Sequence, residues 1–381
     1  MNRIRRRLQP LAFGMICVLL SATPQVFAGD TEEFSEHLVQ AEIALRQNQY
    51  REAAREYRLA AELSDEPGIA QQATLIAYSY GFNEDALASA KRWAKLDDED
   101  DEALLYVAQL YLRTGEVRKS RRSFEKLLKR GPEPADERLL ALIPFLSRED
   151  ASLSYELMLK LARPYKDSAE ANYAVAVMAL QAGDSKAASE RARKASEIEP
   201  DWVKPHLLYA RAMLLSGDEE GAIDYTSRLV GDDPDPDPEA RLELAIMLLS
   251  AGRDDDALSQ VNQILLEHPA RSDALRLMAI INFRLDRLDA ARADFQDLLE
   301  TGHYTMDALY YLGRIADRNS ELEQAVRYYS QVTRGSNAII SQRRAAGIMA
   351  QMGEEEEALE HLSAFAGINP NFALDMLQAQ A

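Results

Sequence analysis

The chain has 381 residues, and its 63 aspartates and glutamates outnumber its 44 lysines and arginines, which leaves a net charge of −19. A surface of this sign repels nucleic acid and anionic lipid, so neither is expected as a partner. Cys17 is the only cysteine, which excludes a disulfide framework. A chain of this length usually forms two or three globular domains, unless it grows along one axis as a repeat array.

The first 28 residues have the pattern of a secretory signal peptide. A cluster of arginines at 3–7 precedes an apolar run at 11–22, which is too short to span a bilayer comfortably. Val26 and Ala28 are small residues three and one positions before Gly29, which predicts cleavage after Ala28. A retained membrane anchor is the alternative. Ile16 does not suit a lipoprotein signal ending at Cys17, so we expect export to the bacterial periplasm without later membrane insertion.

The stretch from Ala169 to Pro200 contains two amphipathic helical runs that are joined by a turn at Gly183. Ala176 lies near the middle of the first run, and Ala188 begins a stripe of alanines on the second. Small side chains at these points let two antiparallel helices approach closely. One such pair is too small to bury its own apolar face, so it needs copies beside it.

Copies of this pair recur about every 33 to 35 residues, which is the spacing of helical-hairpin solenoids. The units begin near residues 34, 67, 101, 134, 169, 203, 238, 272, 306 and 339. The small position of the first helix holds Ala41, Thr74, Ala108, Ala141, Ala176, Ala210, Ala245, Ala279, Gly313 and Ala346. The facing position of the second helix holds Ala53, Ala86, Ser120, Leu153, Ala188, Ala222, Ala257, Ala291, Ala325 and Ala358. The predicted turn residues are Gly81, Gly115, Gly183, Gly217, Gly252 and Gly353, with Asn48, Asp286 and Ser320 in three other units.

This pattern resembles the tetratricopeptide repeat. The aromatic position of the second helix fits as well, at Tyr57, Phe124, Phe295 and Tyr329. The resemblance covers about residues 34 to 370 and implies an all-α fold, a right-handed superhelical solenoid of about ten helix–turn–helix units. An ordinary helical bundle is the alternative, but it would not keep one period over so many units.

The fourth unit departs most from the pattern. Pro144 lies inside its first helix, Arg148 stands at the turn, and Leu153 stands at the small position of the second helix. Because proline lacks an N–H and clashes with the preceding turn, we expect a kink or irregular packing in this unit.

Acidic residues concentrate in two connecting segments, at 97–102 and 231–238. The first lacks the ligand spacing of a calcium loop, and the second alternates with prolines that spread its carboxylates apart. We interpret these acids as residues that complement helix N-termini, within solvated loops. The second segment is also the candidate joint between an N-terminal array at 29–235 and a C-terminal array at 236–370. The remaining residues, 371–381, predict a terminal capping helix or an incomplete repeat.

The sequence contains no recognisable catalytic or cofactor-binding motif. The histidines lie at different places in different repeats, and there is no phosphate-binding loop, zinc-protease motif or nucleophile elbow. We therefore expect no enzyme activity, no cofactor and no metal site.

In tetratricopeptide solenoids the first helices line the concave side, and the resemblance implies the same here. The repeat positions then predict an apolar groove at Leu180, Leu214, Ile246, Leu249, Ile280 and Phe283. Further along, the same side becomes basic at Arg276, Arg284, Arg314, Arg318 and Arg343, with Tyr310 among them. Arginine binds carboxylates through paired hydrogen bonds, so this part suits an acidic partner segment. The alternative is that the arginines pair with local acids such as Asp273, Asp307 and Asp317.

The resemblance implies a non-enzymatic scaffold that binds proteins or peptides in its groove. The chain is loosely similar to periplasmic tetratricopeptide adaptors of the cell envelope, some of which serve proteolysis or peptidoglycan remodelling. It lacks the family's peptide-carboxylate clamp, because Tyr173, Leu207 and Leu242 stand where the clamp has lysine. A carbohydrate or exopolysaccharide-binding module is the alternative, with sugar-stacking candidates at Tyr78, Tyr106, Tyr111, Tyr173, Tyr310 and Tyr311. The sequence leaves the oligomeric state open.

Overall fold

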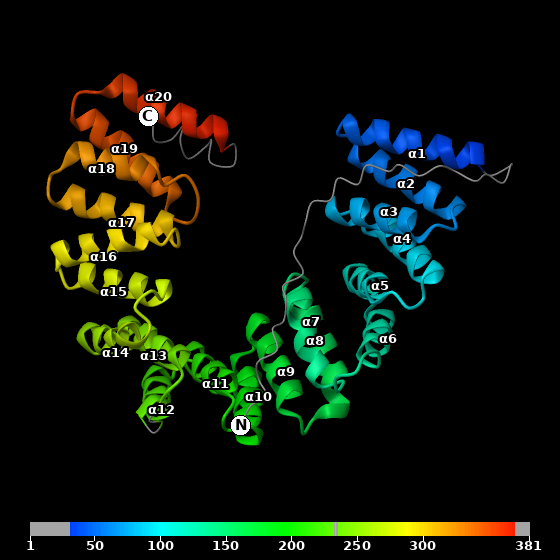
Figure 1. The fold of residues 1–381 in the computed structure, drawn as a ribbon, viewed down its shortest axis with the longest axis horizontal. Coiled ribbons are helices and arrows are strands. Elements are labelled where there is room, and N and C mark those ends of the chain that lie inside the picture. The colour runs from blue at the N-terminus through cyan, green and yellow to red at the C-terminus, as the bar shows by residue number, and fades with distance from the viewer. Residues whose placement is uncertain (1–30, 232, 234, 370–381) are drawn as a thin grey trace. The chain divides into compact units, whose positions relative to one another are not determined.

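The computed structural model describes residues 31–231, 233 and 235–369. These residues form twenty α-helices and one short 3₁₀ helix, with no β-strand among them (Figure 1). This architecture confirms the predicted all-α fold of helix pairs. The predicted signal peptide at 1–28 and the predicted capping helix at 371–381 lie outside the described residues. No described helix has both the length and the apolar character that crossing a bilayer requires.

The helices follow one another as ten pairs. The first five pairs are α1 (Thr31–Arg46) and α2 (Tyr50–Leu63), α3 (Pro67–Ser79) and α4 (Asn83–Leu96), α5 (Asp101–Arg113) and α6 (Val117–Leu128), α7 (Glu137–Leu146) and α8 (Ala151–Ala162), and α9 (Ala169–Gln181) and α10 (Ser185–Ile198). The other five are α11 (Val203–Leu215) and α12 (Glu219–Gly231), α13 (Pro238–Ser250) and α14 (Asp254–Glu267), α15 (Ser272–Arg284) and α16 (Leu288–Glu300), α17 (Thr305–Arg318) and α18 (Leu322–Ser330), and α19 (Ala338–Gln351) and α20 (Glu355–Ile368). The 3₁₀ helix, Arg163–Tyr165, follows α8.

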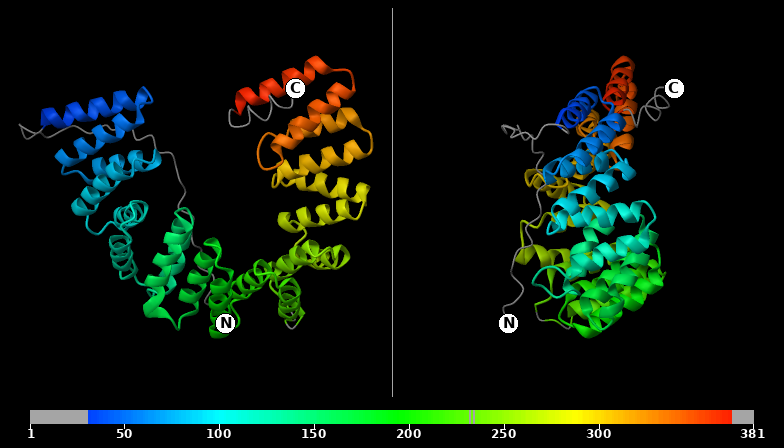
Figure 2. Two further views of the ribbon diagram at one scale, coloured as in Figure 1. Left: turned by 180° about the vertical axis from the view of Figure 1, so that it is seen from behind. Right: turned by 90° about the vertical axis from the view of Figure 1, so that its right-hand side faces the viewer.

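Small residues allow the helices of a pair to pack closely. Within 31–130 and within 137–369, each helix packs against the helix that follows it (Figure 2). In the seventh pair, Ala245 of α13 and Ala257 of α14 are fully buried, as the repeat predicted. Large side chains fill the space beside such alanines, and Trp93, Phe124 and Phe295 are among the most deeply buried. This alternation of small and large residues fills the space between neighbouring helices within each helix pair and its neighbours.

Nine of the ten turns between paired helices contain the predicted residue with a positive φ. The six glycines have φ between 75° and 90°. Asn48, Asp286 and Ser320 adopt φ of 59°, 58° and 59°. Glycine has no Cβ to oppose this conformation, and asparagine and aspartate tolerate it better than other residues. The turn chemistry could therefore be predicted residue by residue.

In the fourth pair the predicted small positions are wrong by one residue. Ala141 is exposed on α7, and Leu153 is only half-buried on α8. The buried small residue is Ser154, whose Oγ donates a hydrogen bond to the carbonyl oxygen of Leu146 at 2.9 Å. The register is thus shifted along both helices, so the alanine faces solvent and the serine faces the neighbouring helix.

Pro144 lies inside α7, which is only 10 residues long. The helix packs more extensively on α9 than on its own partner α8, unlike the first helices of the other pairs. The turn that follows contains no residue with a positive φ, and Arg148 does not take the place of the missing glycine. These features confirm the irregular packing expected from the proline.

The chain divides into two compact units, the first ending at Arg130 and the second beginning at Gly131. The proline-rich acidic segment at 231–238, where the sequence suggested a joint, lies inside the second unit between α12 and α13, which pack against each other. Its Asp237 accepts a hydrogen bond from the Glu239 N–H at 2.8 Å and caps α13. Asp100 caps α5 in the same way. Acids of both segments therefore serve helix N-termini, as interpreted from the sequence.

Candidate functional site

In the second unit, the first helices of successive pairs lie next to each other. Contacts join α9 to α11, α11 to α13 and α13 to α15 (Figure 1). On each helix the same three repeat positions recur, spaced by four and then three residues. They are Leu207, Arg211 and Leu214 on α11, Leu242, Ile246 and Leu249 on α13, Arg276, Ile280 and Phe283 on α15, and Tyr310, Arg314 and Asp317 on α17. We call these positions and the residue after each third one the first-helix face.

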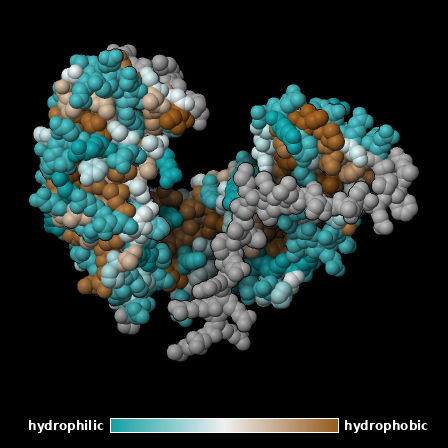
Figure 3. All heavy atoms as spheres, turned by 45° about the horizontal axis from the view of Figure 1, so that its top comes forward, coloured by the Kyte–Doolittle hydropathy of each residue, from teal (hydrophilic) through white to brown (hydrophobic). Residues whose placement is uncertain are grey.

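The apolar part of the first-helix face is largely packed between helices. Its half-buried apolar members are Leu207, Leu214, Leu249 and Ile280, and Leu180, at the corresponding third position on α9, is half-buried as well. Phe283, predicted as a partner contact, is only 4% exposed. Ile246 is 42% exposed, and Leu215, which was not among the predicted partner contacts, is 62% exposed. Hydrophobic residues of the second unit do reach its surface (Figure 3), and on this face they are chiefly Leu215 and Ile246.

The sequence contained a signal that could have identified Leu215. The residue stands at the last position of α11, one step beyond Leu214. Other pairs of the second unit hold exposed polar residues at this position, namely Gln181, Ser250, Arg284 and Arg318. One further residue turns a helix by about 100°, away from the neighbouring helix and toward solvent. A leucine where the other pairs keep a polar side chain is therefore an exposed apolar residue.

Three of the five predicted arginines pair with acids of a neighbouring helix pair. The nitrogen–oxygen distances are 2.6 Å for Arg276–Asp307, 3.0 Å for Arg284–Asp254 and 2.9 Å for Arg318–Asp286. Each ion pair joins residues about one repeat apart, so it bridges successive repeats. The other acids suggested from the sequence have different partners, since Asp273 pairs with Arg271 and Asp317 with Arg344. Much of the basic groove is thus neutralised within the fold.

Arg314 has no carboxylate partner in the described part of the chain. Its guanidinium carbon lies 4.6 Å from the ring centroid of Phe283, 5.5 Å from that of Tyr310 and 5.6 Å from that of Tyr311. Arg318 also lies over Phe283, at 4.5 Å. Phe283 therefore supports two arginines from beneath, which explains its burial. Burial raises the pKa of the Tyr311 hydroxyl, so the phenol stays neutral and adds no negative charge beside Arg314.

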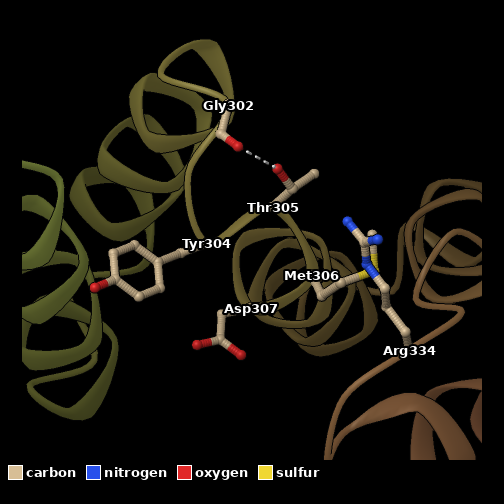
Figure 4. A pocket seen from close by; sticks show the side chains of 6 residues that line it. All are labelled: Gly302, Tyr304, Thr305, Met306, Asp307 and Arg334. Atoms are coloured by element: carbon tan, nitrogen blue, oxygen red, sulfur yellow. Dashed lines mark hydrogen bonds between the residues drawn. The ribbon is translucent and has the colours of Figure 1, made fainter. Parts of the chain in front are cut away.

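Two further cations lie near the end of the second unit. Arg343 of α19 is exposed, and no ion pair with another described residue involves it. Arg334, between α18 and α19, contributes to a cavity of about 250 Å³ at the start of α17 (Figure 4). Tyr304 and Asp307 also line this cavity, but Asp307 is already held by Arg276. Arg334 and Arg343 are therefore the groups near the end of the second unit that can bind a negatively charged ligand.

The six tyrosines of the glycan-binding alternative are all buried or half-buried. Their ring neighbours include Arg113 and Tyr106 for Tyr78, Lys119 for Tyr111, Trp202 for Tyr173, and Phe295 for Tyr311. Burial raises the pKa of Tyr106 to about 12. Because sugar binding uses an exposed ring face, these rings are better explained as packing residues.

The histidines with mapped hydrogen bonds connect helices of their own pair. Nδ1 of His37 lies 2.6 Å from Oε2 of Glu56, and Nδ1 of His206 lies 2.6 Å from the hydroxyl of Tyr225. Burial lowers the pKa of His361, which favours its neutral form. Among the described residues, no three His, Cys, Asp or Glu side chains are grouped so that they could hold a metal ion. The environments of His37, His206 and His361 are thus those of residues that help to pack the helices.

Three segments of the chain match family models of the tetratricopeptide repeat. They are residues 102–133, 220–281 and 276–338. The comparison with curated proteins gives no match.

Several solved structures are similar to the chain. The crystal structure of the APC/C hetero-tetramer Cut9–Hcn1 has a chain 13% identical over 91% of this chain and 96% of that one, with a TM-score of 0.43. PilF of Pseudomonas aeruginosa is 16% identical over 56% of this chain and 96% of its own, with a TM-score of 0.45. MamA is 21% identical over 43% and 96%, with a TM-score of 0.39. The matched segments cover 102–133 and 220–338, and over these residues the helix pairs are similar to the tetratricopeptide repeat.

Proposed function

We propose that this chain is a non-enzymatic scaffold that binds a peptide or helical segment of a partner protein along the first-helix face of its second unit. The observation that carries the proposal is the order in which exposed apolar side chains and an unpaired arginine occur along α11 to α17. Exposed Leu215 and Ile246 are followed, two repeats later, by Arg314, which has no acid partner among the described residues. Tetratricopeptide repeats suggest such a scaffold in general terms, and these residues suggest where this one binds.

The same residues define the ligand. Its apolar side chains would cover Leu215 and Ile246, because exposed leucine and isoleucine gain free energy when they leave water. A carboxylate further along would meet Arg314, whose guanidinium is supported from one side by aromatic rings. Such support holds the side chain in place before binding, which lowers the entropy lost in the complex. The ligand is therefore an apolar segment followed by an acidic residue.

Selection from a random peptide library on the full chain is expected to enrich this pattern. Leu215→Glu and Ile246→Glu should each weaken an enriched peptide at least tenfold, about 1.4 kcal/mol, because they place a charge against its apolar residues. Arg314→Glu should do the same by repelling its carboxylate. The measurement is fluorescence anisotropy with the labelled peptide. Leu266→Glu is the matched control, since Leu266 is 79% exposed but lies on the second helix α14, and it should change affinity less than twofold.

Two results would contradict this assignment. One is a library selection without enrichment, and the other is equal weakening by Leu266→Glu and Ile246→Glu. Binding of oligosaccharides in a glycan array, together with failure to enrich peptides, would instead support the carbohydrate-binding alternative.

We also propose that the scaffold works in the bacterial periplasm, as an adaptor in envelope proteolysis or peptidoglycan remodelling. The support is the amino-terminal sequence, with its basic start, short apolar run and small residues before Gly29. Expression of the full gene in a Gram-negative host should release the protein in the osmotic-shock fraction, and amino-terminal sequencing should begin at Gly29. Blocking cleavage by Ala28→Arg is expected to leave the protein in the membrane fraction. Recovery of the wild type in the cytoplasm with an intact amino terminus would refute export.

A further inference from the structure

Helix α6 of the first unit has a charge opposite to that of the whole protein. Between residues 117 and 130 the chain has seven lysines and arginines and one acid, Glu125, a local charge of +6. The complete chain has a charge of −19. This concentration lies on the second helix of a pair in the first unit, whereas the first-helix face belongs to the second unit, and the scaffold function proposed above does not use it.

The folded helix separates its basic residues from its apolar ones. Phe124, Leu127 and Leu128 are buried. The exposed residues between 117 and 130 are all basic, namely Arg118, Lys119, Arg122, Lys126 and Lys129. At 3.6 residues per turn, Arg118, Arg122, Lys126 and Lys129 fall within about 80° of the helix circumference and extend about 16 Å along it. We call these four side chains the α6 basic stripe.

The remaining cations of the helix are already paired. Lys119 pairs with Glu116, and Arg121 lies 3.2 Å from Glu125. Arg130 lies 3.0 Å from Asp101. In contrast, no carboxylate of the described chain pairs with any member of the α6 basic stripe. The stripe is therefore an array of free cations, whose mutual repulsion at i and i+4 opposes helix formation.

Helix electrostatics alone does not account for the stripe. Cations near a helix C-terminus stabilise it, which explains Lys126 and Lys129. Arg118 lies in the first turn of α6, where the helix dipole disfavours positive charge, and Arg122 lies in the second turn, too far from the C-terminus to gain from it. A neutral polar residue at either position would keep the helix soluble at lower electrostatic cost. A ligand that neutralises the stripe gives these two arginines a role.

The ends of the stripe restrict the shape of that ligand. Glu116 lies just before α6, and Arg130 just after it holds the acidic loop through Asp101 and the carbonyl oxygen of Asp98. A long nucleic acid or a flat anionic membrane would bring negative charge against these acids as well as against the stripe. The face also exposes no aromatic ring for base stacking and no apolar side chain for lipid insertion. A short acidic segment avoids these carboxylates.

We propose that the α6 basic stripe is a docking surface for a short, carboxylate-rich segment of a partner protein. A helical segment with acids at every third or fourth position presents carboxylates at the spacing of the four cations. The two arginines receive carboxylates through paired hydrogen bonds, and the two lysines act as point charges. The contact depends on charge, so its affinity falls as salt screens the pairs.

The test uses the full chain and a fluorescein-labelled helical peptide with glutamate at every third or fourth position. Its binding is followed by fluorescence anisotropy at low salt. The chain carries Arg314→Gln, so that the first-helix face does not contribute. Combining Arg118→Gln, Arg122→Gln, Lys126→Gln and Lys129→Gln is expected to weaken binding at least tenfold. The matched control replaces four exposed cations of α2 and α4, Arg51, Arg55, Lys91 and Lys95, by glutamine and should change affinity less than twofold.

Circular dichroism and the unfolding midpoint must show that both variants fold, which is expected because all eight replaced side chains are exposed. Equal loss in the two variants would mean that only net charge matters and would overturn the proposal. Failure of the Arg314→Gln chain to bind the peptide would also overturn it. Tighter binding of single-stranded DNA or of phosphatidylserine vesicles than of the peptide would show that the occupant is not an acidic protein segment.

Discussion

Replacing Gly313 by alanine is expected to lower the free energy of unfolding by about 1–3 kcal/mol, the usual cost of overpacking a core. Gly313 holds the small position of α17, where an added Cβ would lie 2.8 Å from Cδ1 and Cε1 of Tyr329. The Tyr329 ring is only 3% exposed and has little room to move. Alanine gains about 0.5–1 kcal/mol in helix propensity over glycine, which is smaller than the expected clash.

Gly347 provides the matched control for this substitution. It lies inside α19 of the same unit, and an added Cβ there would meet no atom within 4 Å. Gly347→Ala is therefore expected to raise the free energy of unfolding by about 0.5–1 kcal/mol. Urea unfolding followed by circular dichroism measures both changes. If both variants are stabilised, the close contact between α17 and α18 does not depend on the absence of a side chain at position 313.

The second large effect is expected from Phe124→Ala, which should lower the stability of the first unit by about 3–5 kcal/mol. Phe124 is fully buried on α6, and its removal leaves a cavity. The chain has two tryptophans, Trp93 in the first unit and Trp202 in the second. With Trp202→Phe, fluorescence reports the first unit, and with Trp93→Phe it reports the second. Phe124→Ala should shift the Trp93 transition in urea and leave the Trp202 transition unchanged.

Phe295→Ala is the reciprocal variant. Phe295 occupies the same repeat position as Phe124, is also fully buried, and lies on α16 of the second unit. It should shift the Trp202 transition and leave that of Trp93 unchanged. If either variant moves both transitions together, the two compact units unfold as one cooperative block, and the division after Arg130 has no thermodynamic meaning.

The acidic protein contains basic surface that its net charge conceals. The first-helix face has Arg314 on a support of aromatic rings, and α6 has four exposed cations without acid partners among the described residues. Other arginines of the first-helix face, such as Arg276 and Arg318, are held by acids of the neighbouring repeat. Ion pairs between repeats thus neutralise several of the arginines, whereas Arg314 and the α6 basic stripe have no carboxylate partner among the described residues and can bind an acidic ligand.

The buried positions of the fourth helix pair could not be predicted from the sequence. Counting from Gly183 or Gly252 places the small residues of the fifth and seventh pairs correctly, because a glycine turn sets the spacing between the two helices. The fourth pair has no such turn, and Pro144 shortens its first helix. Without a fixed turn, only packing against α9 decided that Ser154, and not Leu153, is the buried residue.

The sequence by itself determined the helix pairs, their turns and most of the alanines at their contacts, since these follow from residues within one repeat. Only the tertiary structure decided which arginines of the first-helix face are paired with acids and which are not. Arg314 and Arg318 lie four residues apart on one helix, and the sequence predicts the same role for both. In the structure, however, Arg318 pairs with Asp286, while Arg314 lies over aromatic rings. The difference arises because a side chain's partner depends on how neighbouring repeats stack, and the stacking brings together residues about one repeat apart.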